Sequence, residues 1–148
     1  MQNPVLILSA FENQPQRPKV LIVDDSDFLL KITVNIIDKI RLTLMLNFDI
    51  LTSENGEDAY QKYVQHHKDI KMILMDIHMP IMNGYDSTLK IREFEELNGI
   101  EPQTYIVGLS AEESSQHERR CKVVQMNESI SKPITRNQVE QLLIMNFT

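Results

Sequence analysis

The sequence predicts an α/β fold in which five parallel strands form one sheet covered by helices on both faces. From residue 19 onward, short apolar runs alternate with longer segments in which apolar residues recur at helical spacing. The run "VLIV" at 20–23 is uninterrupted, as expected for a strand whose two faces are both covered. Strand and helix patterns that alternate in this way are typical of parallel sheets, because each helix returns the chain to the starting edge.

The five strand segments are short, and a helical pattern follows each of them. In the flavodoxin-like version of this architecture the strands take the order 2-1-3-4-5, so that the first and third strands are neighbours. Ligands then bind beyond the carboxyl ends of those strands. The segments are "VLIV" at 20–23, "FDIL" at 48–51, "KMILMD" at 71–76, "YIVGLS" at 105–110 and "SIS" at 129–131.

Four of the helical segments carry an apolar face, which we expect to pack on the sheet. The residues of these faces are Leu29, Ile32, Ile36, Ile37 and Ile40, then Ala59, Tyr60, Tyr63 and Val64, then Tyr85, Leu89, Ile91 and Phe94, and finally Val139, Leu142, Leu143 and Phe147.

The remaining helical segment, "AEESSQHERRCKVV" at 111–124, is strongly polar. We expect His117 to lie on a solvated face of this helix, among acidic and basic neighbours. Ser110 is followed three positions later by Glu113, which is the pattern of a capping box at the start of a helix.

Composition sets the class of protein. A chain of 148 residues suits one domain, and a net charge of −6 with a pI near 5.2 disfavours a nucleic-acid-binding surface. Cys121 is the only cysteine, which excludes an internal disulfide and a cysteine zinc site. No apolar run approaches the roughly 18 residues that span a bilayer. We expect a cytoplasmic domain without direct membrane insertion, although a parent protein could be membrane-anchored.

The first 18 residues differ from the rest. They contain Pro4, Pro15 and Pro18 and the polar stretch "ENQPQRP". Prolines among polar residues predict an arm or linker at 1–18, followed by a single domain at 19–148.

Polar residues stand at the carboxyl ends of four strands. Asp24 and Asp25 follow the first, Asp76 ends the third, Ser110 ends the fourth and Lys132 follows the fifth. With the order 2-1-3-4-5, all of them converge on one crevice. Adjacent carboxylates repel each other unless a cation neutralises them. An oxygen-rich set of this kind suits Mg²⁺, or Mn²⁺ in its place.

The same crevice has the groups that phosphoryl transfer to a carboxylate requires. Lys132 supplies a compact cation and Ser110 a hydroxyl donor. Taken singly, Asp76 could be a solvated loop residue, Ser110 a helix cap and Lys132 a surface lysine. Their joint position at four strand ends favours the chemical interpretation.

The motifs "VLIVDDS", "ILMDIHMPIMNGYD", "GLSA" and "SKPI" occur in this order, and the chain resembles the receiver domain of two-component signalling. The resemblance covers about residues 19–147. The stretch "MDIHMPIMNG" looks like that of a receiver in a hybrid histidine kinase.

The resemblance implies a role for each site residue. Asp76 would be the phosphorylated aspartate, and Asp24 and Asp25 would hold Mg²⁺ together with Asp76 and the backbone carbonyl of His78. Ser110 would bond a phosphoryl oxygen and Lys132 would pair with the phosphoryl group. The partner would be a histidine kinase or a histidine-phosphotransfer domain. Transient homodimerisation is left open.

The resemblance also directs attention to two positions near the fifth strand. The bond before Pro133 is usually cis in the family. Three residues before the lysine, receivers generally carry an aromatic residue that turns inward on phosphorylation, whereas this chain has Ser129. Asp76 could therefore be phosphorylated normally, while the resulting conformational change is transmitted through other residues.

Two alternative functions remain at this point. A receiver-like module that is never phosphorylated could serve docking or dimerisation. A haloacid-dehalogenase-like phosphatase would use the stretch from Asp25 to Asp27 as its nucleophile motif, but it would leave Asp76 without a role. A receiver would not be a turnover enzyme by itself, since it catalyses its own phosphorylation and slow dephosphorylation.

Overall fold

A computed structural model describes residues 16–148, and most of the expected arm at 1–18 lies outside the described residues. Five parallel strands form one sheet in the order β2-β1-β3-β4-β5, as predicted. The strands are β1 (Lys19–Val23), β2 (Asp49–Ser53), β3 (Ile70–Asp76), β4 (Tyr105–Ser110) and β5 (Glu128–Ser131).

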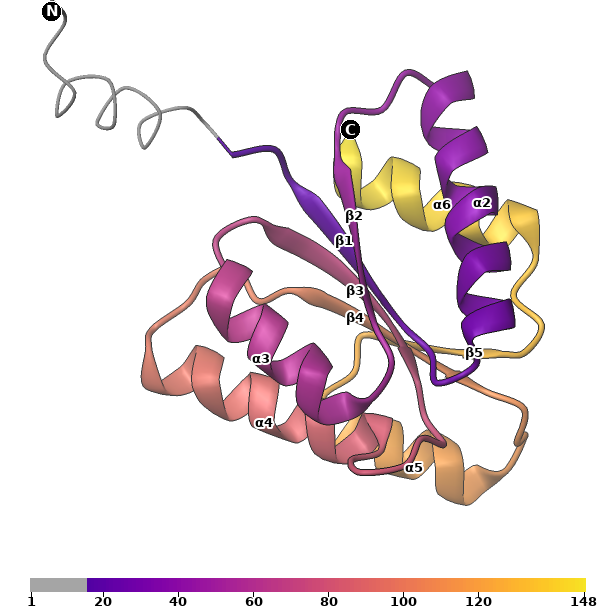
Figure 1. Cartoon of the computed structure of the whole chain (residues 1–148). Helices are drawn as coiled ribbons and strands as arrows, with labels where there is room; N and C mark the ends of the chain where they lie inside the picture. The colour runs from indigo at the N-terminus through magenta and orange to yellow at the C-terminus, as the bar shows by residue number, and fades with distance from the viewer. Residues whose placement is uncertain (1–15) are drawn as a thin grey trace, which may run out of the picture.

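Helices cover both faces of the sheet (Figure 1). α2 (Asp27–Thr43) and α6 (Arg136–Phe147) lie on one face, and α3 (Gly56–His66), α4 (Gly84–Leu97) and α5 (Ser115–Val123) lie on the other. Each face has its own apolar core, because alternate residues of the central strands point to opposite sides. Val20 and Leu74 belong to the core under α2 and α6, whereas Leu21 and Ile73 belong to the other.

The strand register places the site. Val23 at the end of β1 pairs with Met75 of β3, so Asp24 and Asp76 come next on neighbouring strands. Ser110 at the end of β4 pairs with Ser131 of β5. The residues that follow these positions therefore share the carboxyl edge of the sheet.

Gly84 fixes the start of α4 against the end of β3. A Cβ atom at this position would lie 2.3 Å from the carbonyl oxygen of Asp76 and 3.0 Å from the Cα of Ile77. Both contacts are with backbone, so they cannot be relieved by a side-chain rotation. The backbone N–H of Gly84 also donates to the carbonyl of Ile77 at 2.8 Å. The loop that follows Asp76 is thus held tightly by the helix it leads into.

The polar helix begins later than the sequence pattern indicated. α5 starts at Ser115, and its N-cap is Ser114, whose hydroxyl accepts from the backbone N–H of His117. The expected capping box at Ser110 is wrong: the Ser110 hydroxyl accepts from the backbone N–H of Glu112 at 3.0 Å. His117 is buried at 5% exposure where a solvated position was expected, because its ring packs against Tyr85 and Ser129.

Two apolar faces also differ from the prediction. In α2, Ile37 and Ile40 are buried as expected, but Leu29 and Ile32 are about two-fifths exposed, and Leu30 points inward in their place. Leu89 of α4 is exposed as well. The first turns of α2 thus present apolar side chains to solvent beside the carboxyl edge of the sheet.

The peptide bond between Lys132 and Pro133 is cis, as the resemblance implied, and so is the bond between Glu101 and Pro102. Among the described helices, none combines the length and apolar character needed to cross a membrane.

Candidate functional site

Three carboxylates meet at the carboxyl edge of β1 and β3. Asp24, Asp25 and Asp76 each offer an oxygen atom within 4.8 Å of the other two. Asp24 and Asp76 are buried, at 7% and 5% exposure, while Asp25 is exposed. The Oδ1 atom of Asp24 accepts from the backbone N–H of Ser26 at 2.9 Å, which orients this carboxylate at the entrance to α2. The cluster predicted from the sequence is therefore assembled.

Lys132 reaches this cluster from the loop after β5. Its Nζ atom lies 2.9 Å from Oδ1 of Asp76 and 3.3 Å from Oδ2 of Asp24. The lysine side chain is 23% exposed, so its ammonium group is partly withdrawn from water. One cation thus bridges two of the three carboxylates, and the cluster keeps a net negative charge.

The charge balance of the site shows in two pKa shifts. Burial raises the pKa of Asp76, and the carboxylates of Asp24 and Asp25 add to the rise, which exceeds the opposing effect of Lys132. Burial would lower the pKa of Lys132, but its contacts with Asp76 and Asp24 outweigh burial and raise the pKa. Burial is thus the main cause of the Asp76 shift, whereas the neighbouring carboxylates are the cause of the Lys132 shift.

The residues fit a hard divalent cation. Three carboxylates within mutual reach match the oxygen ligands that Mg²⁺ prefers, and Mg²⁺ commonly completes its shell with water and phosphate oxygens. The excess negative charge at Asp76 is what such an ion would relieve. The role of the His78 carbonyl as a further ligand stays a prediction.

Two loops meet beside the carboxylates. The His78 ring nitrogen Nε2 lies 3.5 Å from the Glu112 carboxylate, which connects the loop after β3 with the loop after β4. Both side chains are more than half exposed, so this contact stabilises the fold little. Ser110 is buried at 1% exposure at the base of the second loop.

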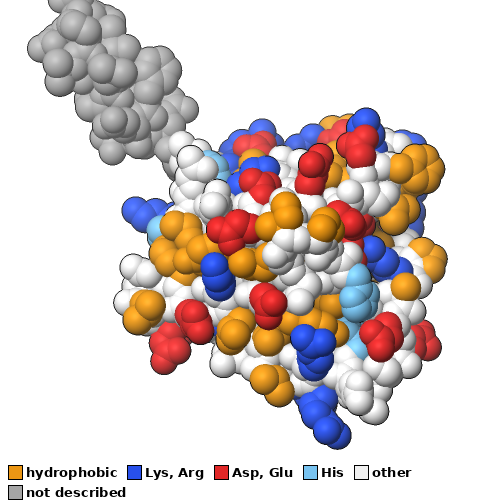
Figure 2. Space-filling model, turned by 60° about the horizontal axis from the view of Figure 1, so that its bottom comes forward, with side chains coloured by type: hydrophobic (Ala, Val, Ile, Leu, Met, Phe, Trp, Pro, Cys, Tyr) orange, Lys and Arg blue, Asp and Glu red, His pale blue; other side chains and the backbone are white. Residues whose placement is uncertain are grey.

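An apolar groove opens directly next to the acidic cluster. Asp24 and Lys132 form one end of it, and the rest is apolar apart from Thr33. Its other lining residues come from α2, from the end of β4 and from the segment after β5: Leu29, Ile32, Thr33, Ile36, Leu109, Pro133 and Ile134. Figure 2 brings this end of the molecule toward the viewer and shows acidic side chains interspersed with apolar ones.

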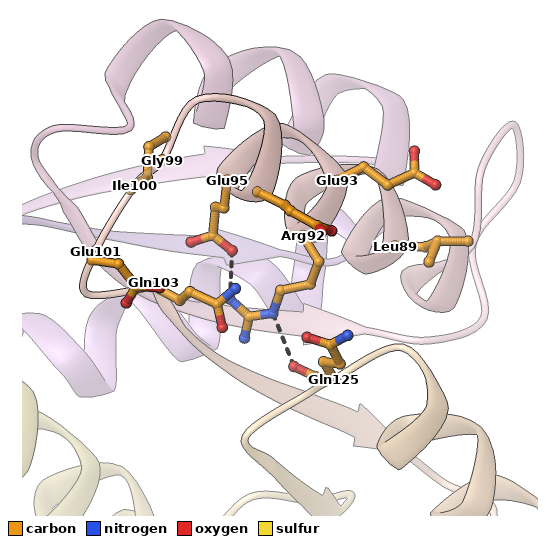
Figure 3. Close-up of a pocket in the computed structure, with 10 residues that line it drawn as sticks. Leu89, Arg92, Glu93, Glu95, Gly99, Ile100, Glu101, Gln103 and Gln125 are labelled. Atoms are coloured by element: carbon orange, nitrogen blue, oxygen red, sulfur yellow. Dashed lines mark hydrogen bonds and ion pairs between the residues drawn. The ribbon is translucent and has the colours of Figure 1, made fainter.

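A second cavity lies at the far end of α4 and contains none of the site residues (Figure 3). Its wall is held by Arg92, which donates to the Glu95 carboxylate at 2.7 Å and to the carbonyl of Gln125 at 2.9 Å. Glu95 in turn accepts from the hydroxyl of Tyr63 at 2.9 Å and from the backbone N–H of Thr104 at 2.8 Å. These buried charges are fully paired, so we assign them to structure.

One buried polar group had no signal in the sequence. The His117 ring lies between Ser129 of β5, whose hydroxyl is 2.9 Å from Nε2, and the hydroxyl of Tyr85, which hydrogen-bonds to Nδ1. A histidine within a run of charged residues gives no indication of burial. Only the packing of α5 against α4 and β5 places it.

Comparison with known proteins agrees with this geometry. The family model described as "Response regulator receiver domain" matches residues 20–144. The chain belongs to the receiver domain family. Receiver domains generally use Mg²⁺, which accords with the acidic cluster.

Curated relatives are much longer than this receiver domain. The chain is 35% identical over 133 residues to the autoinducer 1 sensor kinase/phosphatase LuxN of Vibrio campbellii, covering 86% of the chain and 13% of that protein. It is 33% identical over 115 residues to hybrid signal transduction histidine kinase M of Dictyostelium discoideum, covering 78% of the chain and 4% of that protein. The chain thus spans a small part of the length of these relatives.

Solved structures share the fold. The receiver domain of a Saccharomyces cerevisiae response regulator, crystallised with a histidine phosphotransfer protein, aligns with a TM-score of 0.77 at 22% identity, over 89% of this chain and 90% of that chain. A CheX–CheY complex with BeF3 and Mg²⁺ from Borrelia burgdorferi aligns with a TM-score of 0.69 at 30% identity, over 88% and 90%.

Proposed function

We propose that this receiver domain accepts a phosphoryl group on Asp76 within a two-component phosphorelay. The observation that carries the proposal is the contact of 2.9 Å between Lys132 and Asp76 inside a cluster of three carboxylates. A purely structural ion pair would not need two further acidic groups beside it, because their repulsion destabilises the fold. Such a cluster is useful when a divalent cation and an anionic group bind there.

In the proposed reaction, a carboxylate oxygen of Asp76 attacks the phosphorus of a phosphohistidine. The new O–P bond forms as the N–P bond breaks, and the imidazole leaves with the electron pair and takes up a proton. Lys132 stabilises the negative charge on the transferred oxygens, and the Ser110 hydroxyl donates to one of them. Asp24, Asp25 and Asp76 would hold Mg²⁺, which would neutralise the carboxylates and so lower the electrostatic barrier to an incoming phosphoryl group.

The phosphodonor would dock along the apolar groove beside the cluster. Phe28 is 72% exposed in the first turn of α2, and Leu29 and Ile32 are exposed on the same helix. An exposed apolar groove that reaches Asp24 and Lys132, the lysine that contacts Asp76, suits a protein partner that must present its phosphohistidine to Asp76. We infer a histidine kinase or a histidine-phosphotransfer domain, which accords with the partner named for one structural relative.

We further propose that the domain acts in a hybrid histidine kinase. The curated relatives include several proteins described as hybrid signal transduction histidine kinases, and the match covers only a receiver-sized part of each. The whole-protein activity would then be supplied by segments other than the one described here.

The phosphatase alternative has little support from the geometry. Asp27, which that function would require in the site, lies in the first turn of α2 with its side chain 67% exposed and paired with Lys31 at 2.8 Å. The docking alternative keeps one supporting observation, which is that Ser129 replaces the aromatic residue expected before the lysine.

Intact mass after incubation with Mg²⁺ and acetyl phosphate tests the proposal. We expect one phosphoryl group to be added to the wild-type chain and none without the metal. Asp76→Asn should abolish the addition, whereas the control Asp27→Asn, which changes an acidic residue outside the cluster, should leave it intact. A folded wild-type protein that binds Mg²⁺ but gains no mass would leave the docking function in its place.

A further inference from the structure

His117 lies where three chain segments connected to the site meet: α4 and α5, which follow Asp76 and Ser110, and β5, which leads into Lys132. It belongs to α5, which follows Ser110 after a short loop. Its Nε2 atom is 2.9 Å from the hydroxyl of Ser129 on β5, and its Nδ1 atom hydrogen-bonds to the hydroxyl of Tyr85 on α4. The proposed transfer reaction does not use this buried histidine.

Each hydrogen-bond partner of His117 is connected to a residue of the acceptor site. Tyr85 directly follows Gly84, which packs against the backbone of Asp76. Ser129 lies three residues before Lys132, the residue that pairs with Asp76. A displacement of Asp76 or Lys132 can therefore reach the imidazole through two short and independent pieces of backbone.

The hydrogen-bonding capacity of the His117 ring makes it sensitive to the positions of the Ser129 and Tyr85 hydroxyls. A neutral imidazole has one N–H donor and one acceptor nitrogen, so one of the two hydroxyls must donate to it and the other must accept from it. Moving either hydroxyl changes which tautomer is favoured. The surroundings offer no equal substitute: among the described residues, the only other hydrogen-bond contact of the ring is with the Cys121 sulfur, a weak partner 3.7 Å from Nε2.

The packing around the ring joins the two helices. Tyr85 is buried at 4% exposure, and the guanidinium of Arg120 from α5 lies over its ring at 4.0 Å from the centroid. Tyr85 and His117 have ring centroids 5.8 Å apart. Ser129, in contrast, is exposed on the edge strand and has no ring that could move inward.

We propose that His117 is a positioning residue that couples the state of Asp76 to the packing of α5 against α4 and β5. This inference rests on the proposed function of Asp76. When a phosphoryl group draws Lys132 and Ser110 toward it, the Ser129 and Tyr85 hydroxyls shift relative to the imidazole. The ring then changes its hydrogen-bond arrangement, and the exposed surface of α5 changes with it.

The direct test is nuclear magnetic resonance of the imidazole nitrogens in the full chain, with BeF3⁻ and Mg²⁺ added as a phosphoryl mimic. The chain has four histidines, and His117→Gln assigns the signals of interest. We expect the His117 ring signals to shift when the mimic binds, while those of His66 and His67 at the end of α3 stay in place. The shift should be lost in Asp76→Asn.

The fluorine signal of bound BeF3⁻ separates the two ways in which the test can fail. Saturated binding with unchanged His117 ring signals would overturn the coupling and leave the proposed function standing. Failure of BeF3⁻ to bind in the presence of Mg²⁺ would overturn both, since no state of Asp76 would then exist to be coupled.

Hydrogen exchange of the α5 amides gives a second readout. We expect His117→Gln to gain a phosphoryl group from acetyl phosphate at a rate within about twofold of wild type, since the ring lies outside the acceptor site. The exchange change that the mimic induces in α5 should disappear in this variant. The control Glu118→Gln, an exposed position of the same helix, should retain it. A full α5 response in both variants would refute the role of His117.

Discussion

The Nζ atom of Lys132 lies 2.9 Å from Oδ1 of Asp76, although the two residues come from strands on either side of β4. The same ammonium group is 3.3 Å from Asp24. The lysine thus occupies the place between carboxylates where a transferred phosphoryl group would need a cation. In the metal-free protein the negative charge is only partly neutralised, because one ammonium group lies beside three carboxylates.

Asp76→Asn should raise the free energy of unfolding in the absence of Mg²⁺, by roughly 1 kcal/mol, the usual size of a single-substitution effect. The raised pKa of Asp76 means that its ionised form is less favourable in the folded state than in the unfolded chain. A neutral amide of the same shape removes that penalty. Urea titration at pH 7 with a chelator measures the difference, and Asp27→Asn serves as the control. A less stable Asp76→Asn variant would contradict the electrostatic account.

Lys132→Met should separate metal binding from phosphoryl transfer. Removing the cation leaves Asp24 and Asp76 uncompensated and should destabilise the metal-free fold by about 1–3 kcal/mol. Mg²⁺ should bind at least as tightly as in wild type, because the pocket is then more negative. The rate of phosphoryl uptake should fall by about 10²-fold, the effect typical of a lost charge-stabilising group. Equal losses of Mg²⁺ binding and uptake would instead indicate that Lys132 only holds the pocket in shape.

Stability should depend on His117 at mildly acidic pH. Burial lowers the pKa of His117, and His78 and Arg120 add to this, while Glu112 and Glu118 oppose it. As the pH falls through about 6.5, the unfolded chain therefore takes up a proton that the folded chain does not, and the folded state loses stability. Urea titrations at pH 7.5 and 5.5 should show a larger loss for wild type than for His117→Gln. The comparison of the two proteins cancels the other titrating groups.

The Arg92–Glu95 pair should be structural and independent of the site. Arg92 is 4% exposed, so Arg92→Met leaves the buried Glu95 carboxylate without its cation and should cost about 3–5 kcal/mol. Adding Glu95→Gln should recover more than about 1 kcal/mol of this, because the amide still accepts from Tyr63 and Thr104 without a charge. Phosphoryl uptake by the folded fraction should be unchanged. A selective loss of uptake in Arg92→Met would show that the second cavity influences the acceptor site.

The sequence predicts the convergence of the carboxylates and Lys132 well because its determinants are local. A strand with two covered faces must be continuously apolar, so the polar residues that end it stand out, as Asp24 and Asp76 do. The order of the strands then follows from the rule for doubly wound sheets. Lys132 is placed at the same edge of the sheet once the end of β5 is predicted correctly, because it directly follows that strand.

The features that escaped prediction depend on tertiary packing. The stretch 110–115 has three serines that can cap a helix, and only the contacts of α5 select Ser114 over Ser110. The burial of His117 likewise depends on contacts with distant segments, Tyr85 of α4 and Ser129 of β5. Leu29 and Ile32 have the spacing of core residues, yet they are about two-fifths exposed and line the groove beside the site.

The measurement that tests the central claim most directly is the position of the phosphoryl group on the chain. Borohydride reduction of the acetyl-phosphate-treated protein converts an aspartyl phosphate to homoserine, which peptide mass spectrometry locates. We expect homoserine at position 76 alone, formed only with Mg²⁺ and absent without phosphodonor. Homoserine at position 24 or 25, or phosphate retained on a histidine, would contradict the assignment of Asp76 as the acceptor.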